Sequence, residues 1–359
     1  MDVAVIGASG SVGRAVCMQL LATEVVGSGD RLQLVGRRGG ASEVGIYGQR
    51  IDLMDAFAYR GPRIETVLDG GRIDADIVIV VAGATPPDQP DVIADRHTLA
   101  KVNLPIFEYY AQMLEEHGAK DELVIIQSNP VELAVSVFAD RLGRHRVVGA
   151  GAYNDSLRFR RELADGLAGD RQAAPVVSAY ILGEHGVNAV PIWSSARAAG
   201  MVPGDWEAHL DRVRHPTPLA DLPGKVATTR QRLAELLIAK RPLEAEEYIA
   251  GCPPDIRALV KPWFAHWAGR TSMATAHSAV DVVAQLQSGH RSVLPLQVVV
   301  HADEWPGVDT VMGLPVDIDA TGWHSVVPIP LTDDELTGLR AAGSAIADQL
   351  TRWRTPTSA

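Results

Sequence analysis

Long apolar runs, basic blocks and paired cysteine motifs are missing from this sequence, and each absence excludes a class of protein. No run reaches the roughly 18–20 consecutive apolar residues that a membrane helix needs. The formal net charge is −11 with no cluster of Lys or Arg, so nucleic acid is a poor partner. The two cysteines, Cys17 and Cys252, form no metal or redox motif, and Cys17 lies in an apolar helical stretch that predicts a buried thiol.

The remaining composition is that of an ordinary globular protein. Hydrophobic residues make up 47 % of the 359 residues and charged residues 21 %, which suits two moderate domains sharing an interface. The start of the chain, from Val3 to Gly7, indicates a buried strand rather than an export signal. Together with the unpaired cysteines, this predicts a soluble protein of the cytoplasm.

The first half of the chain alternates short apolar runs with amphipathic stretches. The runs are rich in Val and Ile and do not alternate with polar residues, which indicates strands buried on both faces of a parallel sheet. The pattern predicts an α/β fold with an N-terminal Rossmann doubly wound sheet over residues 1–150. The expected strands are 3–7, 32–36, 77–82, 123–127 and 147–150, and the expected helices are 11–23, 91–117 and 131–142.

The second half, residues 151–359, has a different pattern and predicts a mixed α+β substrate domain. A final helix over 332–352 begins at a Thr-Asp-Asp-Glu sequence suited to a helix N-terminus. The other expected elements are helices over 155–168, 225–240, 254–267 and 272–287 and strands over 292–301, 308–317 and 324–329.

A glycine triplet follows the first predicted strand and opens a helix, in the spacing G-x-x-G-x-x-G. Glycine there permits a tight turn and close approach of the backbone to a pyrophosphate, which lies at the helix N-terminus. Glycines also make plain turns, so the triplet gains weight from its place after a buried strand. The predicted dinucleotide contacts are Gly7, Gly10, Ser11, Val12 and Gly13.

The end of the second predicted strand bears on which dinucleotide binds. NAD enzymes usually place Asp or Glu there for the ribose hydroxyls, but this chain has Gly36, Arg37 and Arg38. Each charged hydrogen bond from these arginines to a 2′-phosphate would contribute about 1.5–3 kcal/mol. The alternative is a solvated pair of arginines. We therefore expect NADP as the preferred cofactor and NAD as the alternative.

Three polar motifs follow in the order and spacing of a known family. They are Ser128-Asn129-Pro130-Val131-Glu132, Asn154-Asp155-Ser156-Leu157-Arg158 and Gly183-Glu184-His185-Gly186. With Val81-Ala82-Gly83 and Gly313-Leu314-Pro315-Val316, they make the chain resemble the L-lactate/L-malate dehydrogenase family over nearly its whole length. The Gly36-Arg37 turn and the Asp155 stretch look most like its malate-type, NADP-using archaeal branch.

The resemblance implies an NAD(P)-dependent 2-hydroxyacid dehydrogenase and assigns roles. His185 would exchange a proton with the substrate oxygen, since imidazole titrates near neutrality. Asp155 would orient the imidazole, and Arg158 would bind the C1 carboxylate with its two-pronged guanidinium. Asn129 would contact the substrate oxygen or the nicotinamide, and the bond to Pro130 is a candidate cis peptide.

The family also implies a loop arginine that polarises the substrate carbonyl. Arg96 lies at the family's spacing before Asn103, so we assign the role to Arg96. The alternative is a surface arginine on the following helix. Ala82, Gly83 and Asn103 join the expected cofactor contacts.

The sequence departs from the malate-type pattern in the loop after Gly83. Pro86 and Pro90 occupy the two candidate positions of the arginine that would bind a distal carboxylate. Thr271 matches a substrate-side Thr or Ser of the family, and we hypothesise that Arg270 beside it replaces the missing arginine. The segment between His185 and Thr271 is long for the family and contains several tryptophans, for which we favour a packing role.

Several readings stay open. Malate/oxaloacetate is the leading substrate pair, and a specialised dehydrogenase for another, bulkier 2-oxo acid is the alternative. A catalytically silent NADP-binding protein would tolerate loss of His185, Asp155 or Arg158, yet all three are present. An NAD-dependent glycosidase would usually need a metal-binding Cys/His set, which we do not find, and we predict no metal. The family usually associates through helices of its first domain, so a homodimer or homotetramer is expected.

Overall fold

The Val- and Ile-rich runs of the sequence form strands of a single mixed sheet in the computed structural model. The structure describes residues 1–69, 71–84, 96–165, 167, 176–186, 188–214, 218–267 and 271–354, apart from the side chains of residues 40 and 41. Within these residues the strands follow the order β3-β2-β1-β4-β5-β6-β9-β10-β7-β8, and β11 pairs with β10. The predicted α/β class is confirmed.

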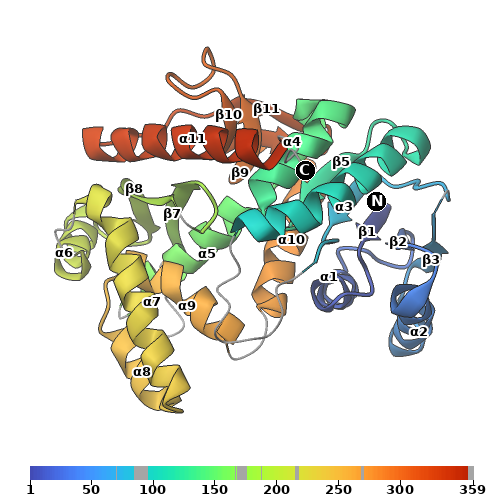
Figure 1. Ribbon diagram of the computed structural model, residues 1–359, viewed down its shortest axis with the longest axis horizontal. Coiled ribbons are helices and arrows are strands. Elements are labelled where there is room, and N and C mark those ends of the chain that lie inside the picture. The colour runs from blue at the N-terminus through green and yellow to red at the C-terminus, as the bar shows by residue number, and fades with distance from the viewer. Residues whose placement is uncertain are drawn as a thin grey trace.

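Strands and helices alternate along the first half of the chain (Figure 1). The elements are β1 (Val3–Ile6), α1 (Ser11–Ala22), β2 (Arg31–Val35), α2 (Gly40–Ala56), β3 (Arg63–Val67), β4 (Ile77–Val80), α3 (Arg96–His117), β5 (Leu123–Ile126), α4 (Val131–Leu142), the short 3₁₀ helix η1 (Arg144–Arg146) and β6 (Val147–Gly149).

The first six strands are parallel to one another, as expected for strands buried on both faces. The strand order reverses at β1, because β2 lies on one side of it and β4 on the other. Right-handed crossovers running in opposite directions place their helices on opposite faces of the sheet. The carboxyl ends of β1 and β4 therefore border the crevice in which such folds bind ligands.

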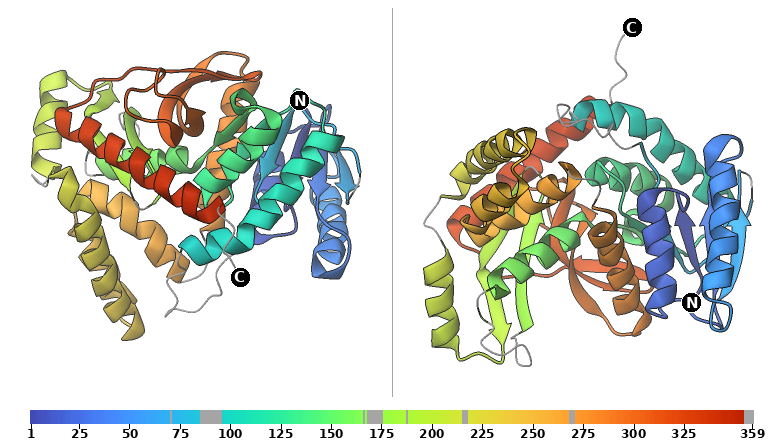
Figure 2. Two further views of the ribbon diagram at one scale, coloured as in Figure 1. Left: turned by 45° about the horizontal axis from the view of Figure 1, so that its top comes forward. Right: turned by 90° about the horizontal axis from the view of Figure 1, so that it is seen from below.

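The second half begins with a helix and continues with antiparallel strands and further helices. The elements are α5 (Gly151–Ala164), β7 (Val176–Gly183), β8 (Ala189–Ala199), α6 (Pro203–Val213), η2 (Leu219–Asp221), α7 (Leu222–Ile238), α8 (Pro242–Ala250), α9 (Pro254–Trp267), α10 (Ser272–Gln287), β9 (Ser292–Val300), β10 (Thr310–Asp319), β11 (Gly322–Val326) and α11 (Asp333–Arg354). In Figures 1 and 2, α6, α7 and α8 lie at the end of the molecule away from α1 and α2.

A narrow junction joins the parallel strands to the antiparallel ones. β6 pairs with β9 only at Gly149 and Gln297, and β10 pairs with β7 only at Gly313 and Gly183. A Cβ atom on Gly149 would come within 2.9 Å of the Gln297 Cβ, and one on Gly313 within 2.7 Å of the Ala152 Cβ. The close approach at the junction therefore depends on glycine, which has no side chain, at positions 149 and 313. The fully buried Gln297 lies there, and its Oε1 accepts a 3.0 Å hydrogen bond from the Ala152 amide at the start of α5.

Most predicted elements match the structure to within a few residues, but several elements were missed. The helix expected over 155–168 begins earlier, at Gly151, because Gln297 bonds its first turn. Three missed helices, α2, α6 and α8, and the strand β3 have short or weak apolar patterns. The long strands β7 and β8 were also missed. Their buried side chains belong to a second apolar cluster, and that cluster forms only when these strands pack against helices distant in the chain.

The final helix begins as its Thr-Asp-Asp-Glu sequence predicts. The Thr332 amide donates to Glu335 Oε2 at 2.9 Å and the Glu335 amide donates to Thr332 Oγ1 at 3.3 Å, which is a reciprocal capping box. Glu335 is fully buried, and its Oε1 also accepts from the amides of Trp193 and Ser194 in β8. The cap therefore fixes α11 to the sheet.

Buried apolar side chains form two clusters. The larger combines the first half with α10, β9, β10 and α11, and the smaller joins α5, β7 and β8 to α6–α9. Trp206 is buried in the smaller cluster, consistent with packing. Cys17 is fully buried as predicted, and burial raises the pKa of its thiol to about 12. The division into domains 1–150 and 151–359 stays a prediction.

Among the helices in the described ranges, none is both long and apolar enough to cross a membrane.

Candidate active site

The carboxyl ends of β1 and β4 meet at the first predicted glycine. Gly7 has a φ of +87°, and a Cβ on it would lie 2.7 Å from the Ala82 amide nitrogen, so only glycine fits both the turn and the approach. Ser128, just after β5, donates to the Ala82 carbonyl at 2.7 Å. The structure therefore gathers the turns after β1, β4 and β5 at one edge of the sheet.

The N-terminus of α1 opens at this edge. Gly10 is its N-cap residue, and no side chain in the described part of the chain caps it. The first amides of a helix have no acceptor within the helix, so those of Ser11, Val12 and Gly13 are available to an anion. These uncapped amides beside the Gly7 turn fit the pyrophosphate of a dinucleotide.

Asn103 of α3 ties two of the surrounding turns together. Its Oδ1 accepts from the Ala84 amide at 2.6 Å, and its Nδ2 donates to the carbonyls of Asn129 at 2.7 Å and Ala84 at 3.1 Å. The Asn129–Pro130 peptide is cis, as the sequence suggested. Because the amide of Asn103 is engaged with the backbone, its predicted contact with a cofactor stays a prediction.

Two exposed arginines follow β2. The Arg37 guanidinium lies 5.9 Å from the centre of the Tyr109 ring, and the Tyr109 hydroxyl donates to Asp69 Oδ1 at 2.6 Å. The Arg38 amide donates to Asp69 Oδ2 at 2.9 Å. Burial would raise the pKa of Asp69, but the bonds from Tyr109 and Arg38 and the charges of both arginines outweigh it and lower that pKa. Asp69 is thus an anion that offsets part of the arginine charge.

The centre of the site is a contact between α5 and the turn after β7. His185 Nδ1 lies 2.7 Å from Asp155 Oδ2, and Arg158 Nη1 donates to Asp155 Oδ1 at 2.8 Å. Burial alone would raise the pKa of the Asp155 carboxyl, but His185 and Arg158 outweigh it and hold that pKa below its ordinary value. An ionised carboxylate only accepts, so Nδ1 of His185 carries the hydrogen and Nε2 is the nitrogen left to meet a substrate.

Two local features bring these side chains together. The Ile181 amide of β7 donates to Ser156 Oγ at 2.9 Å, which fixes α5 against β7 next to Asp155. Gly151 opens α5 beneath the imidazole, where a Cβ would come within 2.8 Å of His185 Cγ. The imidazole therefore occupies space that any larger residue at position 151 would fill.

Arg96, the first residue of α3, has its side chain turned into the site. It forms ion pairs with Glu184 and, at 3.4 Å, with Glu132, and both carboxylates are almost fully buried. Glu132 Oε1 also accepts from the His185 amide at 2.7 Å. Glu132 and Glu184 stand inside two of the polar sequence motifs, but a motif does not show which carboxylate meets which cation.

Of the two remaining predicted substrate contacts, Thr271 and Arg270, the structure describes Thr271. Thr271 is the N-cap residue of α10, and its Oγ1 lies 3.3 Å from Thr275 Oγ1. Arg270, Pro86 and Pro90 lie outside the described residues, so the hypothesis on Arg270 is not addressed. In the described ranges no group of three His, Cys, Asp or Glu side chains could hold a metal ion.

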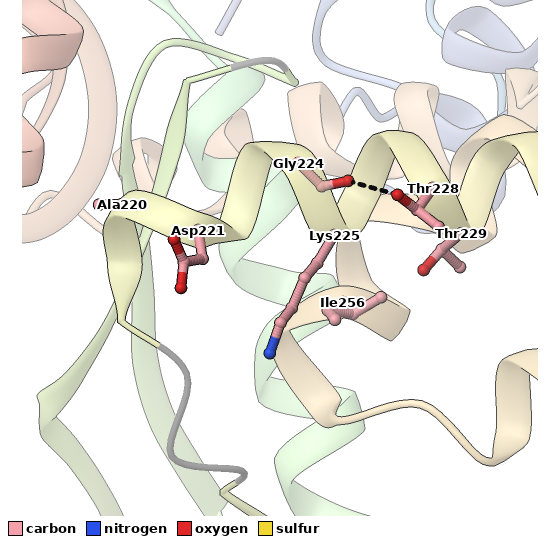
Figure 3. Close-up of a pocket in the computed structure, with 7 residues that line it drawn as sticks. All are labelled: Ala220, Asp221, Gly224, Lys225, Thr228, Thr229 and Ile256. Atoms are coloured by element: carbon pink, nitrogen blue, oxygen red, sulfur yellow. Dashed lines mark hydrogen bonds between the residues drawn. The ribbon is translucent and has the colours of Figure 1, made fainter.

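An open hollow lies along the first turns of α7 (Figure 3). Asp221 at the end of η2 lines it together with Lys225 and Thr229 of α7 and Ile256 of α9. The Thr228 hydroxyl donates to the Gly224 carbonyl at 3.0 Å. None of the residues predicted from the sequence lines this hollow. The site is therefore defined by the side chains around Asp155 and not by this hollow.

Comparisons with known proteins agree with the fold. Residues 1–149 match the family of the lactate/malate dehydrogenase NAD binding domain. The chain is 28% identical over 351 residues to an L-lactate dehydrogenase of Streptococcus agalactiae, with 94% of each chain covered. It is 26% identical over 326 residues to that of Latilactobacillus sakei, with 88% of each covered, and 26% identical over 341 residues to an L-lactate dehydrogenase B-A chain of Danio rerio.

A solved structure of a lactate dehydrogenase enzyme from a deep-sea metagenome library superposes with a TM-score of 0.75. It covers 99% of both chains at 20% identity, which supports the fold.

Fold and site together define an α/β dehydrogenase with an NAD-binding amino-terminal domain. The match of residues 1–149 and the similarity to L-lactate dehydrogenases along most of the chain make it similar to the lactate/malate dehydrogenase family. None of the relatives named above is a malate-type archaeal enzyme, so they do not support the expected closeness to that branch.

Substituting Gly151→Ala should displace His185 from Asp155, because the new Cβ would lie within 2.8 Å of the ring. We expect oxo-acid reduction to fall at least about tenfold, as a displaced acid–base group does in other enzymes. Cofactor affinity, measured by fluorescence titration, should stay within about twofold of the original value, a difference of about 0.4 kcal/mol.

Gly204→Ala is the control, since nothing lies within 4 Å of a Cβ at this position in α6. Unchanged reduction by the Gly151→Ala variant would contradict the proposed importance of the His185–Asp155 contact.

Proposed function

We propose that this chain transfers a hydride between NADP(H) or NAD(H) and a 2-hydroxy acid/2-oxo acid pair. The observation that carries the proposal is the contact of His185 and Arg158 with the same buried carboxylate, Asp155. This arrangement offers a proton donor and a carboxylate-binding cation side by side. The matching family and the names of the relatives support the same class of reaction.

In the reducing direction each side chain has one task. Arg158 binds the C1 carboxylate of the oxo acid and orients its carbonyl. His185 donates the proton from Nε2 to the carbonyl oxygen, and the Asp155 carboxylate stabilises the imidazolium beforehand. Arg96 polarises the carbonyl, and Asn129 contacts the substrate oxygen or the nicotinamide. The bound nicotinamide supplies the hydride.

The substrate is proposed at two levels. Malate/oxaloacetate is our first candidate because of the malate-type motifs around Asp155. The relatives are named L-lactate dehydrogenases, which favours lactate/pyruvate as the second candidate. A specialised enzyme for a bulkier 2-oxo acid is the third. A catalytically silent NADP-binding protein is disfavoured because the acid–base pair and Arg158 are all in contact.

Steady-state reduction of oxaloacetate, pyruvate and larger 2-oxo acids with NADPH and NADH tests the proposal. We expect turnover of at least one acid, and a His185→Gln variant should lose about 10²–10⁴-fold in kcat because the proton donor is gone. His117→Gln, a substitution of a partly exposed histidine at the end of α3, is the matched control.

If the unmodified chain reduces no 2-oxo acid while it binds cofactor tightly, the proposed activity is wrong.

We also propose NADP as the preferred cofactor, with NAD as the alternative. Arg37 and Arg38 are exposed beside the crevice, and the usual acidic residue is replaced by Gly36. A Cβ on Gly36 would lie 2.2 Å from Ile46 Cδ1, so a larger residue there would displace the end of the buried Ile46 side chain. Replacing the arginines leaves this contact unchanged, so they are the better positions to change.

Removing the arginines should lower the preference for NADPH. We expect Arg37→Ala and Arg38→Ala each to raise the KM for NADPH roughly tenfold or more, since a charged hydrogen bond contributes about 1.5–3 kcal/mol. The KM for NADH should change little. Arg60→Ala, in an exposed pair with Glu24, is the control. Equal effects on both cofactors would argue for a packing role of the two arginines.

A second copy of the chain is the proposed partner of helix α2. Val44, Tyr47, Ile51 and Met54 form an exposed apolar stripe along it, with 75%, 47%, 58% and 46% of each residue exposed. Exposed apolar stripes of this kind mark protein interfaces. The expected homodimer or homotetramer would bury this stripe, and the predicted cytoplasmic location is compatible with either state.

Charging the stripe should separate the copies. Sedimentation equilibrium should show an oligomer for the unmodified chain and a monomer for Ile51→Glu, because a buried unpaired carboxylate costs several kcal/mol. Asp52→Lys, a charge change at an exposed position outside the stripe, should leave the oligomer intact. A monomeric unmodified chain would rule out this assembly.

A further inference from the structure

Arg230 lies on the inner face of α7, in the segment that is long for the family. Its helix neighbours Val226, Thr229 and Leu233 are all buried. Arg230 Nη2 donates to the Leu259 carbonyl of α9 at 3.2 Å. Its Nε is buried and has no hydrogen-bond partner among the described residues. This guanidinium is therefore held in place and still has donors to spare.

Helix α9, whose Leu259 carbonyl accepts from Arg230, is itself fixed to helix α5. Glu162 of α5 is buried and accepts from Arg257 Nε of α9 at 2.7 Å and from the Lys261 ammonium of α9. The same helix α5 carries Arg158 about one turn before Glu162 and Asp155 about two turns before it. The Leu259 contact therefore sets Arg230 relative to α5 through a rigid neighbour.

The charges that act on Arg230 belong to the catalytic site. Burial lowers the pKa of its guanidinium, the Asp155 carboxylate raises it, and the Arg96 guanidinium lowers it. Arginine nevertheless stays protonated in proteins. Within the described ranges no carboxylate lies within ion-pairing distance of Arg230. Arg230 is thus a partly buried cation that no carboxylate of the described residues pairs.

Partial burial of a cation without an anion has a free-energy cost, and an anion that arrives with a ligand reduces that cost. Arg158 lies directly against Asp155 and suits the C1 carboxylate, while Arg96 already contacts Glu132 and Glu184. Arg230 is the guanidinium of the three that has no carboxylate in the described structure. We propose that Arg230 binds a second acidic group at the far end of the substrate.

This inference rests on the proposed function and names its substrate class. The substrate would be a dicarboxylic 2-oxo acid, such as oxaloacetate or a longer homologue, and its 2-hydroxy product. The loop positions that would otherwise carry the distal anchor are Pro86 and Pro90 in the sequence, so an anchor from α7 would take over their task. Arg230 is then a specificity-determining residue.

The competing interpretation is a structural role, in which Arg230 only links α7 to α9 through Leu259. A structural link supports the site in the same way for every substrate. A ligand contact discriminates between substrates by their charge. The ratio of two matched substrates therefore separates the two interpretations.

The test compares oxaloacetate with 4-methyl-2-oxopentanoate, in which an uncharged isopropyl group replaces the distal carboxylate. An Arg230→Met variant should lose about 10–100-fold in kcat/KM for oxaloacetate, the range expected for one charged hydrogen bond. Its kcat/KM for the neutral acid should fall less than about threefold. Arg232→Met, two positions along α7 in an exposed pair with Glu235, should change neither value.

A binding measurement accompanies the kinetics. In the presence of cofactor, L-malate should raise the Tm of the unmodified chain more than 2-hydroxy-4-methylpentanoate does, and Arg230→Met should abolish the difference. Arg230→Lys keeps the charge and should retain part of the selectivity. If Arg230→Met fails to fold, Arg230→Lys compared with Arg230→Gln decides the question by the same ratio.

Either of two outcomes for the Arg230 variants would overturn the inference alone: the same loss in kcat/KM for both acids, or no loss for either acid. Fast reduction of the neutral acid beside poor reduction of oxaloacetate by the unmodified chain would do the same. If the unmodified chain reduces no 2-oxo acid with either cofactor, the proposed function fails and the inference fails with it.

Discussion

The buried carboxylate of Asp155 is the interaction on which the site depends. A charge at this depth is tolerated only because His185 and Arg158 both contact it. Those partners come from different elements, so the carboxylate requires α5 and the turn after β7 to meet at one point. The Ser156 hydroxyl and the Gln297 amide, both fully buried, fix α5 at that point from two sides. The contacts that the Asp155 carboxylate requires therefore account for much of how α5 and the turn after β7 are placed.

The three guanidiniums of Arg96, Arg158 and Arg230 differ in how many carboxylates they contact. Arg96 contacts two carboxylates, Arg158 contacts one, and Arg230 has none within the described structure. The carboxylates of the described residues thus neutralise the guanidiniums of Arg96 and Arg158 more fully than that of Arg230. Fixed charges of this kind need no reorganisation when a substrate binds, which is where much of the catalytic power of enzymes arises.

The sequence was sufficient for the elements whose signal is local. The parallel strands, the Gly7 turn and the capping box at Thr332 all follow from short patterns, and the structure confirms them. The grouping of His185 with Asp155 came from the resemblance to a family, because residues distant in the chain leave no local trace of their contact. The acidic residues Glu132 and Glu184 stood in the quoted motifs, yet their pairing with Arg96 depends on three elements at once.

Arg230 shows the limit most clearly. It stands in an ordinary amphipathic helix, where an arginine beside buried positions usually extends to solvent. Only the packing of α7 against α9, and of α9 against α5, turns its guanidinium toward the catalytic charges. Helices such as α6 and α8 were missed for a related reason, since their short apolar faces depend on each other for burial.

The junction between the parallel and antiparallel strands has a consequence for how mutations would reveal it. Gly149 and Gly313 let β6, β9, β10 and β7 pass within contact distance, and each position is occupied by the smallest residue available. Methods that search for important positions by trimming side chains, as alanine scanning does, remove atoms from most residues. At these positions they would add atoms instead. The connection between the two halves of the enzyme thus depends on the absence of side-chain atoms at Gly149 and Gly313, and a scan that only removes atoms would not detect it.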